Sequence, residues 1–246
     1  SHGAMRCSWS GHRWFRRSTM GSFSIMRDID VTGWAKDGQW VIAPAGLDWV
    51  SEGSRLIVGS YASIGDAASI GSYASIGDAA SIGSHARIGS HARIGSHARI
   101  GNDAIIGDAA SIGSHASIGS HARIGSYASI GSYASIGDAA RIGSYASIGD
   151  AASIGSYASI GSYASIGDAA SIGSYAMDPI DIGNVDGYRK CIAHINGVAY
   201  IGAGCRWFTL ADALKHWSGK PSRVLTMSLM QAAIAISDAK GWHHGA

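Results

Sequence analysis

Residues 83–101 read GSHARIGSHARIGSHARIG, a six-residue unit written three times in succession. An aliphatic residue recurs every six positions from Val58 to Ile172 without interruption, twenty times in all. Glycine follows each of these residues, and alanine stands two positions before nearly all of them. Alternation of Ala and Ile around Ser or Arg is typical of a short strand with one buried face. The repeat therefore predicts a series of very short strands separated by turns.

A helix does not fit this period. In a helix of 3.6 residues per turn, a residue repeated every six positions is carried around all sides instead of holding one face. A strand this short cannot bury its apolar face alone, so successive units must stack on one another. The 35 glycines and 15 % charged residues of the 246-residue chain are also unusual for a packed globule. We therefore expect a solenoid in which each layer covers the previous one.

The motif Ala-x-Ile-Gly-x-x, as in Ala62-Ser63-Ile64-Gly65, resembles the hexapeptide repeat of left-handed parallel β-helices. The resemblance implies a mainly β fold in which three hexads form one triangular coil of about 18 residues. The left-handedness of the β-helix is implied by the resemblance alone, because parallel β-strand crossovers are usually right-handed. Twenty hexads correspond to about 6.7 coils and, at roughly 4.8 Å per strand, to a rod of about 32 Å.

Such a coil arranges the sequence into ladders of residues that lie above one another. One ladder of outward positions reads Ser69, Arg87, Ile105, Arg123, Arg141 and Ser159, whereas the other two ladders are mostly serine. Arginine is thus concentrated on one face of the predicted rod. Because guanidinium groups bind phosphate and carboxylate, Arg87, Arg123 and Arg141 are candidates for binding an anion.

The corners of the predicted coil carry aromatic residues. One corner row reads Tyr73, His91, Ala109, Tyr127, Tyr145 and Tyr163. Rings one strand spacing apart can stack and cover backbone, or pack against another subunit. The candidate interface residues are therefore Tyr73, His91, Tyr127, Tyr145 and Tyr163. We expect a homo-oligomer in which this row is buried, and the resemblance implies a trimer.

The histidines of the opening stretch lie on different corners of one coil. His85, His91 and His97 are therefore too far apart to share an ion within one chain. The weaker metal candidates are histidines that stack along the rod, namely His97 with His115, and His85 with His121 on either side of Asp103. Zinc needs three or four ligands that converge at about 2 Å, and a regular ladder does not converge. We expect no metal and no cofactor, and we interpret these histidines as solvated or interface residues.

Two classes of enzyme that the repeat resembles use histidine. Hexapeptide acyltransferases take a general-base histidine and their pocket from loops that interrupt the repeats. The γ-class carbonic anhydrases use histidines at irregular spacing from neighbouring subunits. This chain has no loop between Val58 and Ile172, and a catalytic base needs an orientation that differs from its surroundings. We therefore assign no catalytic residue from the sequence.

The domain boundaries follow from the start and the end of the period, which stops at Met177-Asp178-Pro179. The expected organisation is an expression remnant at residues 1–4, an aromatic-rich N-terminal cap at 5–57, the β-helix at 58–177 and a C-terminal ββαα domain at 178–246.

The N-terminal segment interleaves aromatic residues with arginines before the first acid, Asp28. The residues concerned are Arg6, Trp9, Arg13, Trp14, Phe15, Arg16 and Arg17. Such a pattern can bind phosphate and stack on bases, but four charges are few, so nucleic acid is disfavoured as a partner. A cap that covers the open end of the solenoid, with small strands such as residues 40–43, is the favoured interpretation.

The C-terminal segment alternates around Asn196-Gly197, which predicts a hairpin. Thr209-Leu210-Ala211-Asp212 is a capping box that opens a helix ending near Ser218, and residues 223–240 predict a second helix. The module resembles the C-terminal domain of uncharacterised phage and prophage hexapeptide-repeat proteins. That resemblance carries no catalytic residues.

Composition gives few clues to partners. The net charge of +2 provides no global field towards nucleic acid or a membrane. No apolar run approaches the ~20 residues needed to span a bilayer, and no signal peptide is seen. Cys7, Cys191 and Cys205 are interpreted as reduced thiols of a cytoplasmic or virion protein, with a Cys191–Cys205 bridge and a reactive Cys205 as less favoured alternatives.

The sequence thus predicts a non-catalytic structural or binding scaffold. In this interpretation a rigid β-solenoid, related to phage proteins, presents its terminal domains or a regular surface to a partner that the sequence does not identify. The alternative is a hexapeptide acyltransferase-like enzyme with an intersubunit site. A second alternative is ice binding by a ladder face, which is weakened because Arg87, Arg93 and Arg99 interrupt the serine rows.

Overall fold

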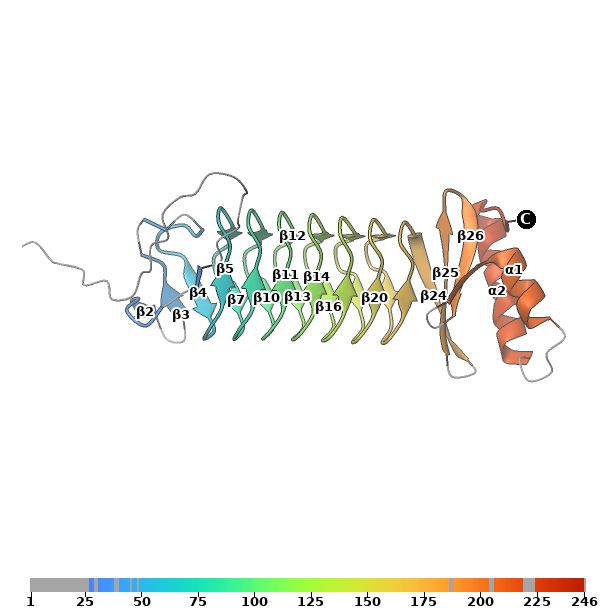
Figure 1. The fold of residues 1–246 in the computed structure, drawn as a ribbon, viewed down its shortest axis with the longest axis horizontal. Helices are drawn as coiled ribbons and strands as arrows, with labels where there is room; N and C mark the ends of the chain where they lie inside the picture. The colour runs from blue at the N-terminus through green and yellow to red at the C-terminus, as the bar shows by residue number, and fades with distance from the viewer. Residues whose placement is uncertain are drawn as a thin grey trace, which may run out of the picture.

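The computed structural model describes residues 27–28, 31–37, 40–44, 46–47, 49–185, 188–203, 206–218 and 224–245. The described chain forms a straight rod of stacked coils, with short strands at its N-terminal end and a sheet covered by two helices at its C-terminal end (Figure 1). The fold is mainly β, a left-handed parallel β-helix, as predicted. No helix within the described ranges is long and apolar enough to span a membrane.

Each coil contributes one short strand to each of three sheets. The first face consists of β1 (Arg27–Asp28), β5 (Ser63–Ile64), β8 (Ser81–Ile82), β11 (Arg99–Ile100), β14 (Ser117–Ile118), β17 (Ser135–Ile136), β20 (Ser153–Ile154) and β23 (Ser171–Ile172). The second face consists of β2 (Lys36–Asp37), β3 (Trp40–Ile42), β4 (Arg55–Val58), β7 (Ser75–Ile76), β10 (Arg93–Ile94), β13 (Ser111–Ile112), β16 (Ser129–Ile130), β19 (Ser147–Ile148) and β22 (Ser165–Ile166).

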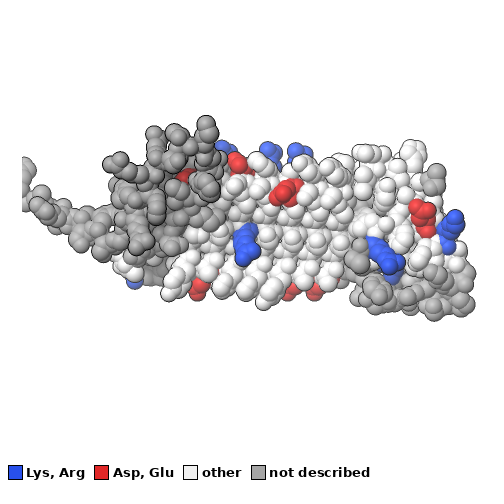
Figure 2. All heavy atoms as spheres, in the orientation of Figure 1, with Lys and Arg blue, Asp and Glu red and all other residues white. Residues whose placement is uncertain are grey.

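The third face carries three arginines and is called the arginine face. It consists of β6 (Ser69–Ile70), β9 (Arg87–Ile88), β12 (Ile105–Ile106), β15 (Arg123–Ile124), β18 (Arg141–Ile142) and β21 (Ser159–Ile160). Its sheet continues into the C-terminal domain through β24 (Met177–Val185), β25 (Tyr188–Ile195), β26 (Val198–Ala203) and β27 (Arg206–Thr209). Most of the solenoid surface in view carries no formal charge, and basic side chains lie along its upper edge (Figure 2).

The strands pair in parallel with a register of one coil. Ile106, for example, lies opposite Ile88 on one side and Ile124 on the other. The inward-facing isoleucines of the solenoid, which recur every six residues from Ile64 to Ile172, are at most 3 % exposed, so each one covers the next along the axis. Burying an isoleucine side chain contributes about 1.5–3 kcal/mol, which makes this column the main source of stability.

The corners turn through left-handed backbone. Tyr127 has a φ of 61° and is typical of the corner position, which non-glycine residues occupy throughout the solenoid. A left-handed conformation costs an L-residue roughly 1–2 kcal/mol. The cost is offset because each corner amide donates to the previous coil, as Tyr127 N does to the carbonyl of Asp108 at 2.9 Å.

Aspartate or asparagine directly after the glycine adds a second link between coils. The carboxylate oxygen Oδ1 of Asp138 accepts the amide of Ser120 at 2.7 Å, one coil earlier in the chain. The same contact is made by Asp78 to Ser60, Asn102 to Ser84, Asp108 to Ser90, Asp150 to Ser132 and Asp168 to Asp150. These side chains therefore strengthen the corners.

The described part of the N-terminal segment forms short antiparallel strands at the end of the rod. Strand β1 pairs with β5, and β3 pairs with both β2 and β4. Trp34 and Trp49 stack with ring centroids 5.8 Å apart and pack on the end of the core. The predicted cap strand at residues 40–43 is confirmed. The arginine-aromatic segment of residues 6–17 lies outside the described residues.

The C-terminal domain contains the predicted hairpin and both predicted helices, α1 (Leu210–Trp217) and α2 (Val224–Lys240). Asn196 and Gly197 take positive φ angles of 51° and 79° at the tip of the β25–β26 hairpin. Thr209 Oγ1 accepts the amide of Asp212 at 3.1 Å, which confirms the cap. The domain differs from the expected ββαα module by two further strands, because β24 and β27 lie on either side of the hairpin.

Candidate functional site

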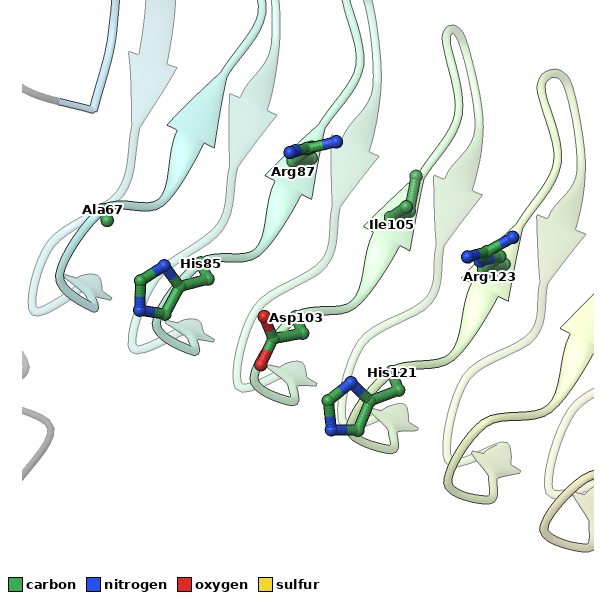
Figure 3. A pocket seen from close by; sticks show the side chains of 7 residues that line it. All are labelled: Ala67, His85, Arg87, Asp103, Ile105, His121 and Arg123. Carbon is green, nitrogen blue, oxygen red and sulfur yellow. The ribbon is translucent and has the colours of Figure 1, made fainter. Parts of the chain in front are cut away.

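A shallow hollow of about 350 Å³ lies where the first face turns into the arginine face. Two parallel rows of side chains from four successive coils line it (Figure 3). His85, Asp103 and His121 form the corner row, preceded by Ala67. Arg87, Ile105 and Arg123 form the second row, on strands β9, β12 and β15. The hollow therefore combines two imidazoles, one carboxylate and two guanidiniums around an aliphatic floor.

The middle coil of the hollow comes from a hexad that departs from the repeat. Residues 101–106 read GNDAII, so Asp103 stands where other corners carry Tyr, His or Ala, and Ile105 stands where other strands carry Ser or Arg. The side chain of Ile105 is shorter than those of Arg87 and Arg123 on either side of it, and this difference in length produces the hollow. The departure from the copied hexad is the sequence signal that could have indicated this site.

Backbone contacts fix the spacing of the corner row. The amide of Asp103 donates to the carbonyl of Ser84 at 2.9 Å, and the amide of His121 donates to that of Asn102 at 2.8 Å. The side chain of Asn102 also accepts the amide of Ser84 at 2.9 Å. The three corner residues are consequently held one strand spacing apart, about 4.8 Å.

The two histidines of this row differ from the other histidines of the solenoid. His91 stacks on Tyr73 with centroids 5.0 Å apart, while His97 and His115 stack on each other at 4.8 Å. His115 also stacks on Tyr133 at 4.8 Å. His85 and His121 instead have Asp103 between them and an alanine, Ala67 or Ala139, on the outer side. Both rings therefore keep an open face next to a carboxylate.

The polar atoms of the hollow remain available to a ligand. His85, Asp103, His121, Arg87 and Arg123 are all exposed. Within the described residues, their side chains form no hydrogen bond or ion pair with one another. A substrate can therefore take up these donors and acceptors without displacing an internal contact.

The candidate metal ligands do not converge. His97 and His115 are nearly coplanar in their stack, with 7° between the rings, so their nitrogens point in the same direction. His85 and His121 are separated by a whole coil. No group of three or more His, Cys, Asp or Glu in the described ranges is placed to hold a metal ion.

The predicted aromatic row is present in one chain. Tyr127, Tyr145 and Tyr163 stack with centroids 4.9 and 5.1 Å apart and are 57 %, 50 % and 76 % exposed. Tyr73 and His91 form a separate stack, because Ala109 interrupts the row. Burial of this row in a homotrimer remains a prediction.

Cys191 lies on β25, where the C-terminal sheet meets the last coil. Its thiol is 4 % exposed and donates to the carbonyl of Ser171 at 3.5 Å. Burial, with a further contribution from the Asp181 carboxylate, raises the pKa of Cys191 from 9.0 to about 12. The thiol is thus a core group and not a nucleophile. Its alternative partner Cys205 lies outside the described residues.

We expect Cys191 to resist alkylation in the folded protein. A pKa raised by about three units lowers the thiolate fraction at pH 8 roughly a thousandfold, and only the thiolate reacts. Iodoacetamide labelling of a Cys7→Ser/Cys205→Ser variant, followed by mass spectrometry, should show no modification at pH 8 and rapid modification in denaturant. Equal labelling rates in the two conditions would contradict the burial of this thiol.

A second hollow, of about 490 Å³, lies at the C-terminal segment. His244 Nε2 lies 2.8 Å from Asp238 Oδ1, so this carboxylate is already engaged by an imidazole. The backbone of His243 is fixed by hydrogen bonds with Gly197 and Ala199. Trp242 packs on His194 with ring centroids 4.8 Å apart. The arrangement anchors the chain segment against the hairpin.

The repeats match a known family model. Residues 61–96, 97–132 and 133–168 each match the model described as bacterial transferase hexapeptide (six repeats). Across residues 61–168 the solenoid is similar to the bacterial transferase hexapeptide. No curated protein sequence matches the chain.

Three of the solved structures similar to this chain are acyltransferases by name, with low sequence identity. A mutant perosamine N-acetyltransferase from Caulobacter crescentus, in complex with CoA and GDP-perosamine, is 17 % identical over 49 % of this chain and 52 % of that one, with a TM-score of 0.35. The UDP-N-acetylglucosamine acyltransferase of Francisella novicida is 18 % identical over 76 % and 80 %, with a TM-score of 0.39. LpxA from Acinetobacter baumannii is 19 % identical over 82 % and 92 %, with a TM-score of 0.30. The match thus spans about half of the perosamine enzyme.

These findings correct the prediction of a non-catalytic scaffold, which is wrong. The hexapeptide model that matches the repeats carries the name of a bacterial transferase. The findings agree better with the alternative, an acyltransferase-like enzyme with an intersubunit site. None of them shows the expected phage resemblance. Likeness at this level of identity shows the fold alone, so the activity has to be inferred from the site.

Proposed function

We propose that the protein is a hexapeptide-type acyltransferase that uses the hollow at His85, Asp103 and His121. The observation that carries the proposal is the pair of unstacked histidines on either side of one carboxylate, next to Arg87 and Arg123. The match to the bacterial transferase hexapeptide supports it. Its substrates would be an acyl thioester and an acceptor with an amine or hydroxyl group.

The residues of the hollow suit the proton transfers of this reaction. A neutral imidazole, of His85 or His121, accepts the proton of the acceptor nucleophile as that atom attacks the thioester carbonyl carbon. The new C–N or C–O bond forms, the C–S bond breaks, and the imidazolium returns the proton to the departing thiolate. Asp103 lies at a spacing that side-chain rotation can close to a hydrogen bond, so it orients the imidazole and stabilises its charged form.

The guanidiniums and the floor account for the remaining requirements. Arg87 and Arg123 can stabilise negative charge on the substrate or on the carbonyl oxygen in the transition state. Ile105 offers an aliphatic surface between them. The hollow is shallow in a single chain, and excluding water strengthens such electrostatic interactions. We infer that a neighbouring subunit of a homotrimer closes the site.

The proposal is tested by thioester cleavage. Purified protein is incubated with acetyl- and longer-chain acyl-coenzyme A and a set of amino and hydroxyl sugars, and the released thiol is measured. We expect acceptor-dependent release that falls by about 10²–10⁴-fold in the His85→Gln/His121→Gln variant, because a general base contributes about that factor. Asp103→Asn should lower kcat more than it changes KM.

His97→Gln/His115→Gln is the matched control, since it removes two solenoid histidines whose rings stack on each other in another row. It should retain the rate of the wild type. Equal rates in the two double variants would contradict the assignment of the base. Absence of acceptor-dependent thiol release across the whole set would contradict the acyltransferase activity.

A further inference from the structure

Two arginines of the arginine face lie directly opposite each other. Strands β15 and β18 pair in parallel with Arg123 in register with Arg141, and both side chains are exposed. The spacing of paired strands places their backbones about 4.8 Å apart. Like charges opposite each other in a sheet are destabilising. The pair therefore costs stability in the free protein.

Two other arginines of the solenoid, Arg93 and Arg99, have serine at the paired positions of the adjacent strands. Arg93 pairs with Ser75 and Ser111 on the second face. Arg99 pairs with Ser81 and Ser117 on the first face. Placing arginine next to serine is thus compatible with the same backbone, and the contiguous pair on the arginine face is not required by the fold.

Asp103 lines the hollow beside Arg123, but no carboxylate within the described residues forms an ion pair with either arginine. Asp138, the acid closest to Arg141 in the chain, accepts the amide of Ser120 at 2.7 Å. Asp108, in the preceding coil, accepts the amide of Ser90 at 2.8 Å. Neither Arg123 nor Arg141 forms an ion pair within the part of the chain that the structure describes. Both guanidiniums therefore keep all their donors for an external anion.

We propose that Arg123 and Arg141 bind a diphosphate group of the substrate. A guanidinium presents a planar fork that matches two phosphate oxygens. Two such forks one strand apart suit two linked phosphates, which carry more negative charge and more acceptor oxygens than a single phosphate. Arg123 also borders the hollow, so the rest of a ligand held by the pair extends towards His121 and Asp103.

The inference deepens the proposed function, because it assigns a substrate class to the same site, but the binding itself requires no catalysis. A diphosphate can belong to either substrate, as part of a nucleoside-diphosphate acceptor or as part of a coenzyme A donor. The shared chemistry is two linked phosphates on a group that reaches the hollow.

The test is calorimetric titration of the full chain with inorganic pyrophosphate and with orthophosphate. We expect pyrophosphate to bind at one site per chain and at least ten times more tightly than orthophosphate. Binding should also raise the melting temperature. Arg123→Gln/Arg141→Gln should weaken pyrophosphate binding about tenfold or more for each arginine, because hydrogen bonds to charged groups are the stronger ones.

The matched control is Arg93→Gln/Arg99→Gln, which removes the same charge from the two other faces and should leave the affinity unchanged. Equal weakening by the two double variants, or equal affinity for pyrophosphate and orthophosphate, would overturn the proposal. A third result would also overturn the proposal. If a single-stranded oligonucleotide bound more tightly with increasing length, and displaced pyrophosphate only above a minimum length, the arginines would belong to a surface that binds polyanions.

Competition identifies the source of the diphosphate. Displacement of pyrophosphate by a nucleoside-diphosphate sugar but not by coenzyme A assigns the pair to the acceptor, and the reverse result assigns it to the donor. Either result supports the diphosphate site, and displacement by neither contradicts it. Pyrophosphate binding without any thiol release would contradict the proposed acyltransferase activity but support the diphosphate site. Thiol release that is unchanged in Arg123→Gln/Arg141→Gln would support the activity but contradict the diphosphate site.

Discussion

Deleting residues 125–142, one whole coil, should leave a folded but shorter rod, whereas deleting only residues 131–133 should unfold the solenoid. Strands pair only with the coils before and after them, so removal of a complete coil joins Ile124 to Gly143 in the original register. Loss of three residues instead shifts all later strands by an odd number. An odd shift moves the isoleucines from the buried face to the surface.

Circular dichroism, thermal melting and size-exclusion chromatography measure the outcome. The coil deletion should retain the β signal and a cooperative transition. The three-residue deletion should lose both or aggregate, because the isoleucines of the later coils become exposed. Similar melting curves for the two deletions would contradict this register.

The solenoid could be predicted from the sequence because its stability depends on local, repeated contacts. The Ile-Gly period already contains the buried column, and the spacing of 18 residues gives the rows of Arg87, Ile105 and Arg123 on one face. The hairpin at Asn196-Gly197 and the cap at Thr209 are likewise set by a few adjacent residues. In the hairpin and the helix cap a few adjacent residues determine the backbone, whereas in the solenoid the same pairing recurs every 18 residues.

The end of the rod was harder to predict because it depends on non-local pairing. Met177-Asp178-Pro179 interrupts the hexads, yet Met177 still pairs in parallel with Ser159, and β24 continues the sheet in an antiparallel direction to β25. An open sheet edge favours such an extension, since its amides and carbonyls otherwise lack partners. The burial of Lys190 within this sheet, 2 % exposed, has no signature in the sequence pattern.

The candidate site was only partly predictable. The arginine ladder predicted Arg87 and Arg123 as anion-binding candidates. The corner row predicted His85 and His121 only as weak metal candidates, and they were interpreted as solvated or interface residues. The combination of the two ladders into one hollow depends on the lower profile of Ile105 between the arginines. Identical hexads predict the same surroundings for every histidine in the solenoid. The histidines were therefore interpreted as surface residues. The hexad that departs from the repeat, residues 101–106, supplies Asp103 and Ile105 to the proposed site.

Replacing Gly95 by alanine should strongly destabilise the solenoid, although the residue lies in an ordinary turn. A Cβ atom at Gly95 would lie 2.5 Å from the amide nitrogen of Ser114 and 2.7 Å from the carbonyl carbon of Gly113, both backbone atoms of the next coil. Backbone held in a sheet cannot move aside, and overpacking typically costs about 1–3 kcal/mol. At about 2–4 °C per kcal/mol for a chain of this size, we expect the melting temperature to fall by several degrees.

Gly161 provides the matched control, because it occupies the same place in its hexad and is also followed by serine. A Cβ atom there would meet only the Asp178 side-chain oxygen, at 3.8 Å, since the chain leaves the regular coil beyond this point. Gly161→Ala should therefore be neutral or slightly stabilising, by about 0.5 kcal/mol, through the lower entropy of the unfolded chain. If both substitutions lowered the melting temperature equally, intrinsic backbone preference would be the cause. A difference confined to Gly95→Ala would show that close contact between coils makes the repeated glycine necessary.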